Sequence, residues 1–329
     1  MMSSAQLPRH VAVLVLVILA CSFAGNHVAA RIAFDHDAGL LVAILFRSGV
    51  AMVALFCLVI WRRESLRFQP QAWGWQLLMG LLIAIQSFCI YSAVARIPIA
   101  LALLVVNLAP IMLALLTWAL GGARPSCAAS LLMLFILFGL ALALDLPSRL
   151  SDSGEIDIKF IEGLLFGITA AAVFACALWI TDHRLGSMPG LVRSLLTIMV
   201  VFISTAVVGA SGLIPNGMSL PTASAGWVAL VSLAILYGAA FSVLFTLVTR
   251  LDIARNAPVM NVEPVAGLIF GWLILDQVLG GIQIAGGLIV VSGIVMLAYT
   301  KIPGKQLSRP PCESNATKRG NICAADSQA

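Results

Sequence analysis

Ten long runs of apolar residues divide this chain of 329 residues. Each run is close to the length of about 20 residues that an α-helix needs to cross a bilayer. Apolar residues occupy every face of the runs, without the alternation of a strand, so the runs predict helices and not a membrane β-barrel. The runs cover residues 11–33, 39–61, 73–95, 97–120, 126–145, 161–180, 191–212, 226–249, 253–275 and 281–300. The first run could also be a signal peptide, but its length favours an uncleaved span.

Composition agrees with a membrane protein and excludes other classes. The chain is 61% hydrophobic and only 10% charged, whereas a soluble domain carries about 25% charged residues. A water-soluble enzyme needs a polar shell and a disordered chain needs low hydrophobicity, so both are excluded. The seven cysteines include no CxxC pair, and no His and Asp residues cluster with the spacing of metal ligands. We therefore expect no disulfide framework, no metal and no cofactor.

The basic residues are distributed unequally between the two sides of the predicted bundle. With the N-terminus inside, thirteen of the 19 Lys and Arg residues lie on the inner side and four on the outer side. The positive-inside rule therefore predicts that both termini are cytoplasmic, in a multi-pass protein of a bacterial inner membrane. The formal net charge of +5 is then a signal of topology, and we expect no nucleic-acid partner.

An internal repeat relates the two halves of the chain. When the chain is shifted by 154 residues, residues 94–145 align with 248–299 without a gap. The informative matches are Arg96 with Arg250, Asn107 with Asn261, Pro110 with Pro264 and Trp118 with Trp272. Because each half has an odd number of helices, the second half would enter the membrane from the opposite side. Such inverted repeats are typical of secondary transporters.

The sequence thus predicts an all-α integral membrane protein with ten transmembrane helices in two inverted five-helix repeats. We expect a cytoplasmic N-terminus at residues 1–10, a first repeat at 11–145 and an outer polar loop at 146–160. A second repeat would cover 161–300, and a disordered cytoplasmic tail would cover 301–329.

Short motifs in matching order resemble the EamA-type permeases of the drug/metabolite transporter superfamily. Residues 22–30 (SFAGNHVAA) resemble the first-helix W-G-S-N-F-x-x-x-K stretch of that family, and residues 46–48 (FRS) resemble its L-R-F. Residues 107–110 (NLAP) and 261–264 (NVEP) resemble the proline motifs of its two repeats. The chain departs from the family after helices four and nine, where neither of the usual glutamates is present. The resemblance implies export of amino acids, related metabolites or xenobiotics, with vitamin or nucleotide-derivative uptake also known among relatives.

The charged residues inside the bilayer are mainly Arg47, Arg193 and Glu263. A charge at the bilayer centre costs at least about 2.5–3.5 kcal/mol on insertion scales, so it is retained where it faces a cavity or a partner. Glu263 could exchange a proton during transport or contact substrate, or it could be a structural partner of Arg47 or Arg193. The two arginines, about 12 Å from a helix end in matching places, could contact an anion or carboxylate. They could also form packing ion pairs or snorkel to the interface.

Two asparagines precede prolines by three residues. Pro110 and Pro264 lack a backbone donor and are candidates for helix breaks. Asn107 and Asn261 could therefore bind substrate or cap the carbonyl groups that such breaks leave free.

Two further positions are candidates for substrate or proton contacts. His27, beside Asn26, could be a proton-linked gate, because an imidazole titrates near pH 6.5, or it could be a hydrogen-bonded packing group. Trp179 could wall a site for a ring-bearing substrate, or it could belong to the interfacial aromatic belt. The GxxxG stretches at 163–167 and 267–271 favour close helix packing within the chain over a dimer face, and the protein could be a monomer or a homodimer.

These features predict a secondary transporter that moves a small organic metabolite by alternating access. We expect a site between the halves, built from helices one, two, four, six, seven and nine, with protons as a possible coupling ion. No ATP-binding or metalloprotease motif occurs, so an enzyme is not expected. Rival interpretations are an uptake permease, a membrane-embedded enzyme, a channel and an assembly subunit without its own substrate.

Overall fold

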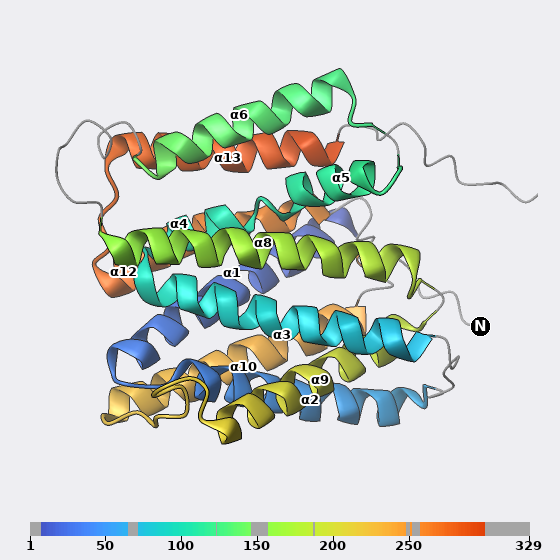
Figure 1. Ribbon diagram of the computed structural model, residues 1–329, viewed down its shortest axis with the longest axis vertical. Helices are drawn as coiled ribbons and strands as arrows, with labels where there is room; N and C mark the ends of the chain where they lie inside the picture. The colour runs from blue at the N-terminus through green and yellow to red at the C-terminus, as the bar shows by residue number, and fades with distance from the viewer. Residues whose placement is uncertain are drawn as a thin grey trace, which may run out of the picture.

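The computed structural model describes residues 8–64, 72–122, 124–145, 157–186, 188–247, 251 and 257–299. These residues form helices joined by short connections and contain no strand, as the sequence predicted. The helices run across the molecule roughly side by side (Figure 1). Most of the outer polar loop, the C-terminal tail and the first seven residues lie outside the described residues.

Twelve helical elements follow one another along the described chain. The first half contains α1 (Arg9–Asp35), α2 (Leu40–Arg62), α3 (Trp73–Arg96), α4 (Ile99–Val106), α5 (Ala109–Ala119) and α6 (Cys127–Ala143). The second half contains α8 (Ile158–His183), α9 (Gly190–Ser211), α10 (Ser224–Leu247), the 3-10 helix η2 (Ala257–Val262), α12 (Glu263–Leu275) and α13 (Gly281–Tyr299). The helix α8 therefore begins before residue 161, within the stretch expected to be loop.

Seven helices in the described part of the chain are long and apolar enough to cross a membrane. They are α1, α2, α3, α8, α9, α10 and the pair α4–α5 taken together as Ile99–Ala119. The remaining three predicted runs form shorter apolar helices at Cys127–Ala143, Val259–Leu275 and Gly281–Leu297. The chain is thus an all-helical, multi-pass membrane protein.

Two of the predicted helices are interrupted at corresponding positions of the two halves. The run 97–120 forms α4 and α5, and the run 253–275 forms η2 and α12. Pro110 and Pro264 are each the second residue of the helix that follows the interruption. Proline is tolerated there because the first backbone N–H groups of a helix have no partner within that helix.

The most extensive contacts join helices that are distant in the sequence. The helix α3 packs on α8, α6 packs on α13, and both α1 and α2 pack on α10. In Figure 1 the pair α6 and α13 forms one edge of the molecule, and α2, α9 and α10 lie at the opposite edge. The two halves are therefore interleaved and do not form separate bodies.

Glycines permit the closest of these approaches. A Cβ atom at Gly163 would lie 2.6 Å from Cγ2 of Ile97, and one at Gly267 would lie 2.6 Å from Cδ1 of Leu103. The two GxxxG stretches thus pack α8 and α12 against the first half, which confirms the expectation of close packing within the chain.

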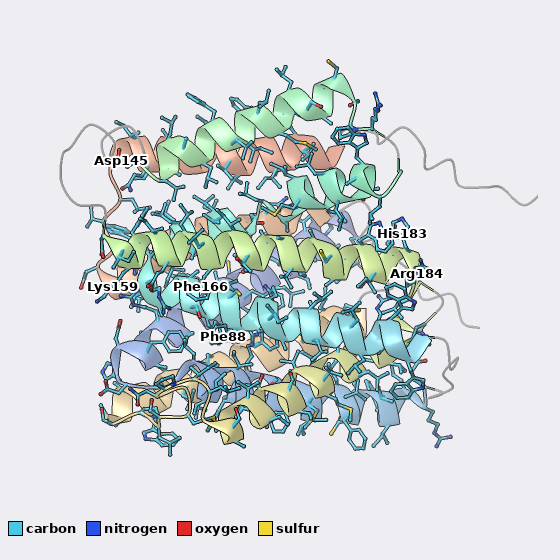
Figure 2. The ribbon with its side chains drawn as sticks, in the orientation of Figure 1. Phe88, Asp145, Lys159, Phe166, His183 and Arg184 are labelled. Carbon is cyan, nitrogen blue, oxygen red and sulfur yellow. The ribbon has the colours of Figure 1, made fainter. Side chains whose placement is uncertain are left out.

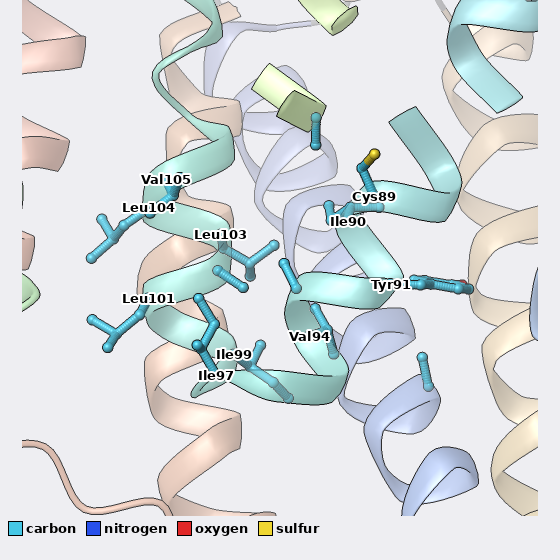
Figure 3. Close-up of a cluster of buried hydrophobic side chains, with 14 of the residues drawn as sticks. Cys89, Ile90, Tyr91, Val94, Ile97, Ile99, Leu101, Leu103, Leu104 and Val105 are labelled. Carbon is cyan, nitrogen blue, oxygen red and sulfur yellow. The ribbon is translucent and has the colours of Figure 1, made fainter. Parts of the chain in front are cut away.

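Apolar side chains fill the interior and also cover much of the outside. Ile97, Ile99, Leu101 and Leu103 are almost completely buried beside α3 and α4, and Tyr91 extends from α3 away from α4 (Figure 3). On the outside, large apolar side chains are exposed along α6 and most other helices. Charged side chains gather at the ends, with Lys159 and Arg184 at opposite ends of α8 (Figure 2). This distribution suits a bundle surrounded by hydrocarbon.

Candidate functional site

A buried arginine lies between the side chains of three helices. Arg47 is the eighth residue of α2, and only 4% of it is exposed. Its Nη2 donates a hydrogen bond of 2.6 Å to Oγ of Ser87 on α3. The guanidinium carbon lies 4.7 Å from the ring centroid of Tyr91 and 4.3 Å from that of Tyr237 on α10. Both distances are within the range of cation–π attraction.

Arg47 differs from Arg31 and Arg96 in having no acidic partner within the described chain. Arg31 pairs with Asp35 at 3.1 Å, and Arg96 pairs with Glu162 at 2.9 Å. Among the residues that the structure covers, none supplies a carboxylate to Arg47 within ion-pair distance, and its buried Nε has no hydrogen-bond partner. The contacts of the Arg47 guanidinium within the described chain are therefore with neutral side chains, those of Ser87, Tyr91 and Tyr237.

A contact between a histidine and a carboxylate joins the first helix to the second half of the chain. Nε2 of His27 on α1 lies 3.6 Å from Oε1 of Glu263, the first residue of α12. The positive end of the α12 dipole favours a carboxylate at this position. Sequence reasoning offered Arg47 or Arg193 as the structural partner of Glu263, but the partner in the structure is His27.

Tyr91 connects this pair with the arginine. Its hydroxyl donates a hydrogen bond of 2.9 Å to Oδ1 of Asn26, and its ring meets the imidazole of His27 edge-on at 5.9 Å between centroids. Three buried nitrogen atoms at this place lack a partner within the described chain: Nδ2 of Asn26, Nδ1 of His27 and Nε of Arg47. We call the following residues the central polar cluster: Asn26, His27, Arg47, Ser87, Tyr91, Tyr237 and Glu263.

The second predicted arginine lies elsewhere. Arg193 is the fourth residue of α9, so it occupies the first helical turn and not the expected depth of about 12 Å. Its Nη1 donates to the carbonyl oxygen of Leu185 at 3.1 Å, and its own carbonyl accepts from Nε2 of Gln76 at 3.2 Å. Arg193 therefore connects the α8–α9 turn with α3 at one end of the bundle.

Asn107 and Trp179 contact residues outside the cluster, and Asn261 lies two residues before Glu263. Nδ2 of Asn107 donates to the carbonyl oxygen of Leu103 at 2.8 Å, one turn earlier in the chain. Asn261 is half-buried within η2. Trp179 stacks on His183 at 4.5 Å between centroids, near the end of α8.

The cluster uses partly different helices from those expected. Helices one, two and nine of the predicted set contribute, whereas the candidates on helices four, six and seven do not. Helices three and eight contribute instead through Ser87, Tyr91 and Tyr237, which sequence reasoning missed. The sequence did contain a signal for the two tyrosines. The chain has only three tyrosines, and two of them lie inside apolar helices. Tyrosines at the ends of spans would instead fit an interfacial belt.

A separate groove of about 510 Å³ runs beside α1. Side chains of α1, α10 and α12 line it, among them Val17, Ile18, Leu236 and Phe270. Its lining is almost entirely apolar and includes no member of the central polar cluster. The groove and the cluster are therefore distinct places in the fold.

Comparison with known proteins identifies the family. The model of the EamA-like transporter family matches residues 10–144 and again residues 161–299. The chain belongs to the EamA-like transporter family. The resemblance seen in the short motifs is thereby confirmed.

The sequence identity to individual relatives is low. The chain is 25% identical over 264 residues to the pseudopaline exporter CntI from two strains of Pseudomonas aeruginosa. Each alignment covers 78% of this chain and 86% of the exporter. One solved crystal structure superposes with a TM-score of 0.59 at 20% identity, over 89% of this chain and 97% of the other. That likeness shows a shared fold.

Proposed function

We propose that this protein is a secondary transporter that exports a small organic metabolite by alternating access, with the central polar cluster as its substrate site. The observation that carries the proposal is that both halves build the cluster. Asn26, His27 and Arg47 come from the first half, and Tyr237 and Glu263 come from the second. A rocking motion of one half against the other would therefore change access to these groups.

The packing supports two repeats related by exchange of the halves. The first helices of the two halves are α1 and α8, and the third helices are α3 and α10. The contacts α1–α10 and α3–α8 therefore both join the first helix of one half to the third helix of the other. The contacts of α2 with α10 and of α3 with α9 are likewise equivalent, second against third. The contacts α2–α9, α4–α12 and α6–α13 each join corresponding helices. With five spans in each half, such exchange symmetry implies the inverted arrangement.

We count the three shorter apolar helices as spans in this arrangement. The helix α13 has 19 residues and α6 has 17, and both lengths are within the range of about 17–25 residues for a membrane-spanning helix. A bilayer can become thinner around a short span. Ten spans then place both termini in the cytoplasm of a bacterial cell, by the positive-inside rule. Residues 11–145 and 161–300 are the two repeats in this proposal.

One end of the bundle is closed by contacts between loops of the two halves. The backbone N–H of Gly39 donates to the carbonyl oxygen of Ser219 at 2.9 Å, and that of Leu41 donates to Gly217 at 3.0 Å. These bonds join the α1–α2 connection to the α9–α10 connection. In the proposed topology this is the outer end.

Side-chain bonds at the same end also cross between the halves. Oγ1 of Thr222 donates to Oδ2 of Asp37 at 3.1 Å, and the exposed pair of Arg96 and Glu162 joins α3 to α8. Exposed polar contacts of this kind are individually weak, so they can break and re-form in a transport cycle. The structure thus supports a state in which the outer end is closed.

The relatives support export of a metabolite. Those relatives export pseudopaline, and we extend to this chain only the class of activity, the outward movement of a small organic solute. Uptake of a vitamin or nucleotide derivative is the alternative within the family. A membrane-embedded enzyme would chemically convert its substrate, and an assembly subunit or a channel would show no saturable, substrate-specific exchange.

The test compares metabolites outside cells that express the wild-type protein or the Glu263→Gln variant. Export predicts that a defined set of metabolites accumulates outside wild-type cells only, without new conversion products. Variant and wild-type membranes are checked for equal protein content. Identical profiles in the two strains, at equal protein content, would contradict the proposal.

A further inference from the structure

We propose that Arg47 binds a carboxylate group of the transported solute, which rests on the transport function proposed above. The site consists of the donor edge of the Arg47 guanidinium with the neighbouring amide of Asn26 and imidazole of His27. The ligand class is a small organic molecule with a singly charged carboxylate.

The charge of Arg47 is the first reason. A guanidinium removed from water inside a membrane protein is costly unless a partner compensates its charge. Arg193 has a carbonyl partner at 3.1 Å, and Arg96 has a carboxylate at 2.9 Å. Arg47 is more deeply buried than both, and its contacts within the described chain are with the neutral side chains of Ser87, Tyr91 and Tyr237. A bound anion would supply the missing negative charge.

The unpartnered nitrogen atoms are the second reason. A guanidinium has five N–H donors, and Nε of Arg47 is buried without an acceptor. Nδ2 of Asn26 and Nδ1 of His27 are in the same condition, and both residues contact the same tyrosine as Arg47 does. Oδ1 of Asn26 already accepts from Tyr91, so its amino group remains for a ligand. A two-oxygen anion can accept from Nε of Arg47 and from Nδ2 of Asn26 together.

The charge balance selects the type of anion. The fork of an arginine matches carboxylate and phosphate oxygens. Within the described part of the cluster, Arg47 is the one permanent cation, and the other side of the His27 imidazole already faces the Glu263 carboxylate at 3.6 Å. A doubly charged phosphate would therefore leave a negative charge uncompensated. A single carboxylate would not.

Thermal melting of the purified full-length protein in detergent tests this assignment with the simplest probes. Sodium acetate is the carboxylate, acetamide is its uncharged counterpart, and sodium chloride and inorganic phosphate are the other anions. Ionic strength is held constant with sodium isethionate, a bulky sulfonate. At an acetate concentration ten times its Kd, we expect the melting temperature to rise by about 3 °C. Acetamide at the same concentration should cause no rise.

Variants separate this site from general anion effects. The rise should disappear in Arg47→Gln, decrease in Arg47→Lys, which keeps the charge but not the fork, and persist in Arg193→Gln. Because Arg47→Gln could fail to fold, the Arg47→Lys variant and the acetate–acetamide difference each test the assignment independently. No rise with acetate, equal rises with acetate and acetamide, or an equal rise in Arg47→Lys and wild type would overturn it. An equal or larger rise with chloride or phosphate would overturn the carboxylate assignment.

Failure of this inference is distinguishable from failure of the transport proposal. If the wild-type protein exchanges uncharged or cationic solutes in liposomes while acetate has no effect on melting, transport stands and the carboxylate site is wrong.

Discussion

His27 on α1 faces Glu263 on α12 across 3.6 Å, in a place where few other groups can ionise. The two residues belong to different halves of the chain, and both side chains are largely shielded from the surroundings. A histidine and a carboxylate at this separation interact strongly only while the imidazole is protonated. The pair therefore links the charge of the site to the contact between the halves.

Removing the carboxylate of this pair should impair transport with little effect on folding. We expect Glu263→Gln to lower the initial rate of solute exchange at least about tenfold, because the loss of one interaction of about 1.4 kcal/mol already has that effect. Gln preserves the shape and the hydrogen-bonding capacity of the side chain. Radiolabelled exchange in proteoliposomes measures the rate.

The matched control for that variant is Glu162→Gln, which removes a carboxylate from the exposed pair with Arg96. An exposed pair contributes about 0–1 kcal/mol, so exchange should remain within a few-fold of wild type. Equal losses in the two variants would show that Glu263 has no special role.

Proton coupling is tested by the pH dependence of exchange. Arg47, Tyr91 and Glu263 are the charged or titratable groups that contact His27 or lie beside it. We expect that the pH dependence of wild-type exchange between pH 5 and 8 is altered in both His27→Phe and Glu263→Gln, because each variant removes one proton acceptor of the pair. Unchanged pH profiles in both variants would rule out coupling through this pair.

Opening of the end near Asp37 is required by alternating access. Asp37→Cys and Thr222→Cys are combined in a variant without native cysteines. A short bifunctional maleimide can join the two new thiols, because Oγ1 of Thr222 and Oδ2 of Asp37 are 3.1 Å apart. Cross-linking should abolish exchange in proportion to the fraction of protein that is joined.

The two single-cysteine variants, treated with the same reagent, are the controls and should retain exchange. Full exchange by completely cross-linked protein would contradict opening at this end.

The contact between α6 and α13 should be sensitive to a single methyl group. A Cβ atom at Gly286 would overlap the backbone nitrogen of Ala143, whereas a Cβ atom at Gly281, on the same helix, would meet open space. We expect Gly286→Ala to destabilise the protein by about 1–3 kcal/mol, as overpacking does. Gly281→Ala should be neutral or slightly stabilising, since alanine favours a helix. Melting in detergent compares the two, and equal melting temperatures would contradict the packing described for α6 and α13.

Local sequence patterns determine the helices more than the site. Apolar runs and prolines are local, so they predicted the helices and the positions of Pro110 and Pro264 at interruptions. The helices α6 and α13 begin and end within two residues of the predicted runs 126–145 and 281–300, whereas the run 253–275 is divided between η2 and α12. Both η2, which ends directly before Glu263, and α12 pack on α1, and a local pattern does not predict such tertiary contacts.

The partners within the site depend on tertiary structure. The sequence pointed to Arg47 and Glu263 as costly charges in a bilayer and to His27 as a proton-linked gate or a packing group, and all three lie in the central polar cluster. It could not show that His27 and not an arginine faces Glu263, because the two residues are far apart in the chain. Arg193 had the same residue type and repeat position as Arg47, but the start of α9 places it at the end of the bundle.

Counterflow through the purified protein in liposomes tests the central claim most directly. Liposomes are loaded with a solute that accumulates outside expressing cells, and a trace of the labelled solute is added outside. A transporter with the central polar cluster as its site predicts transient, saturable accumulation of label above the external concentration, which Glu263→Gln greatly reduces. Label that only equilibrates without saturation, or equal counterflow in wild type and Glu263→Gln, would contradict the account.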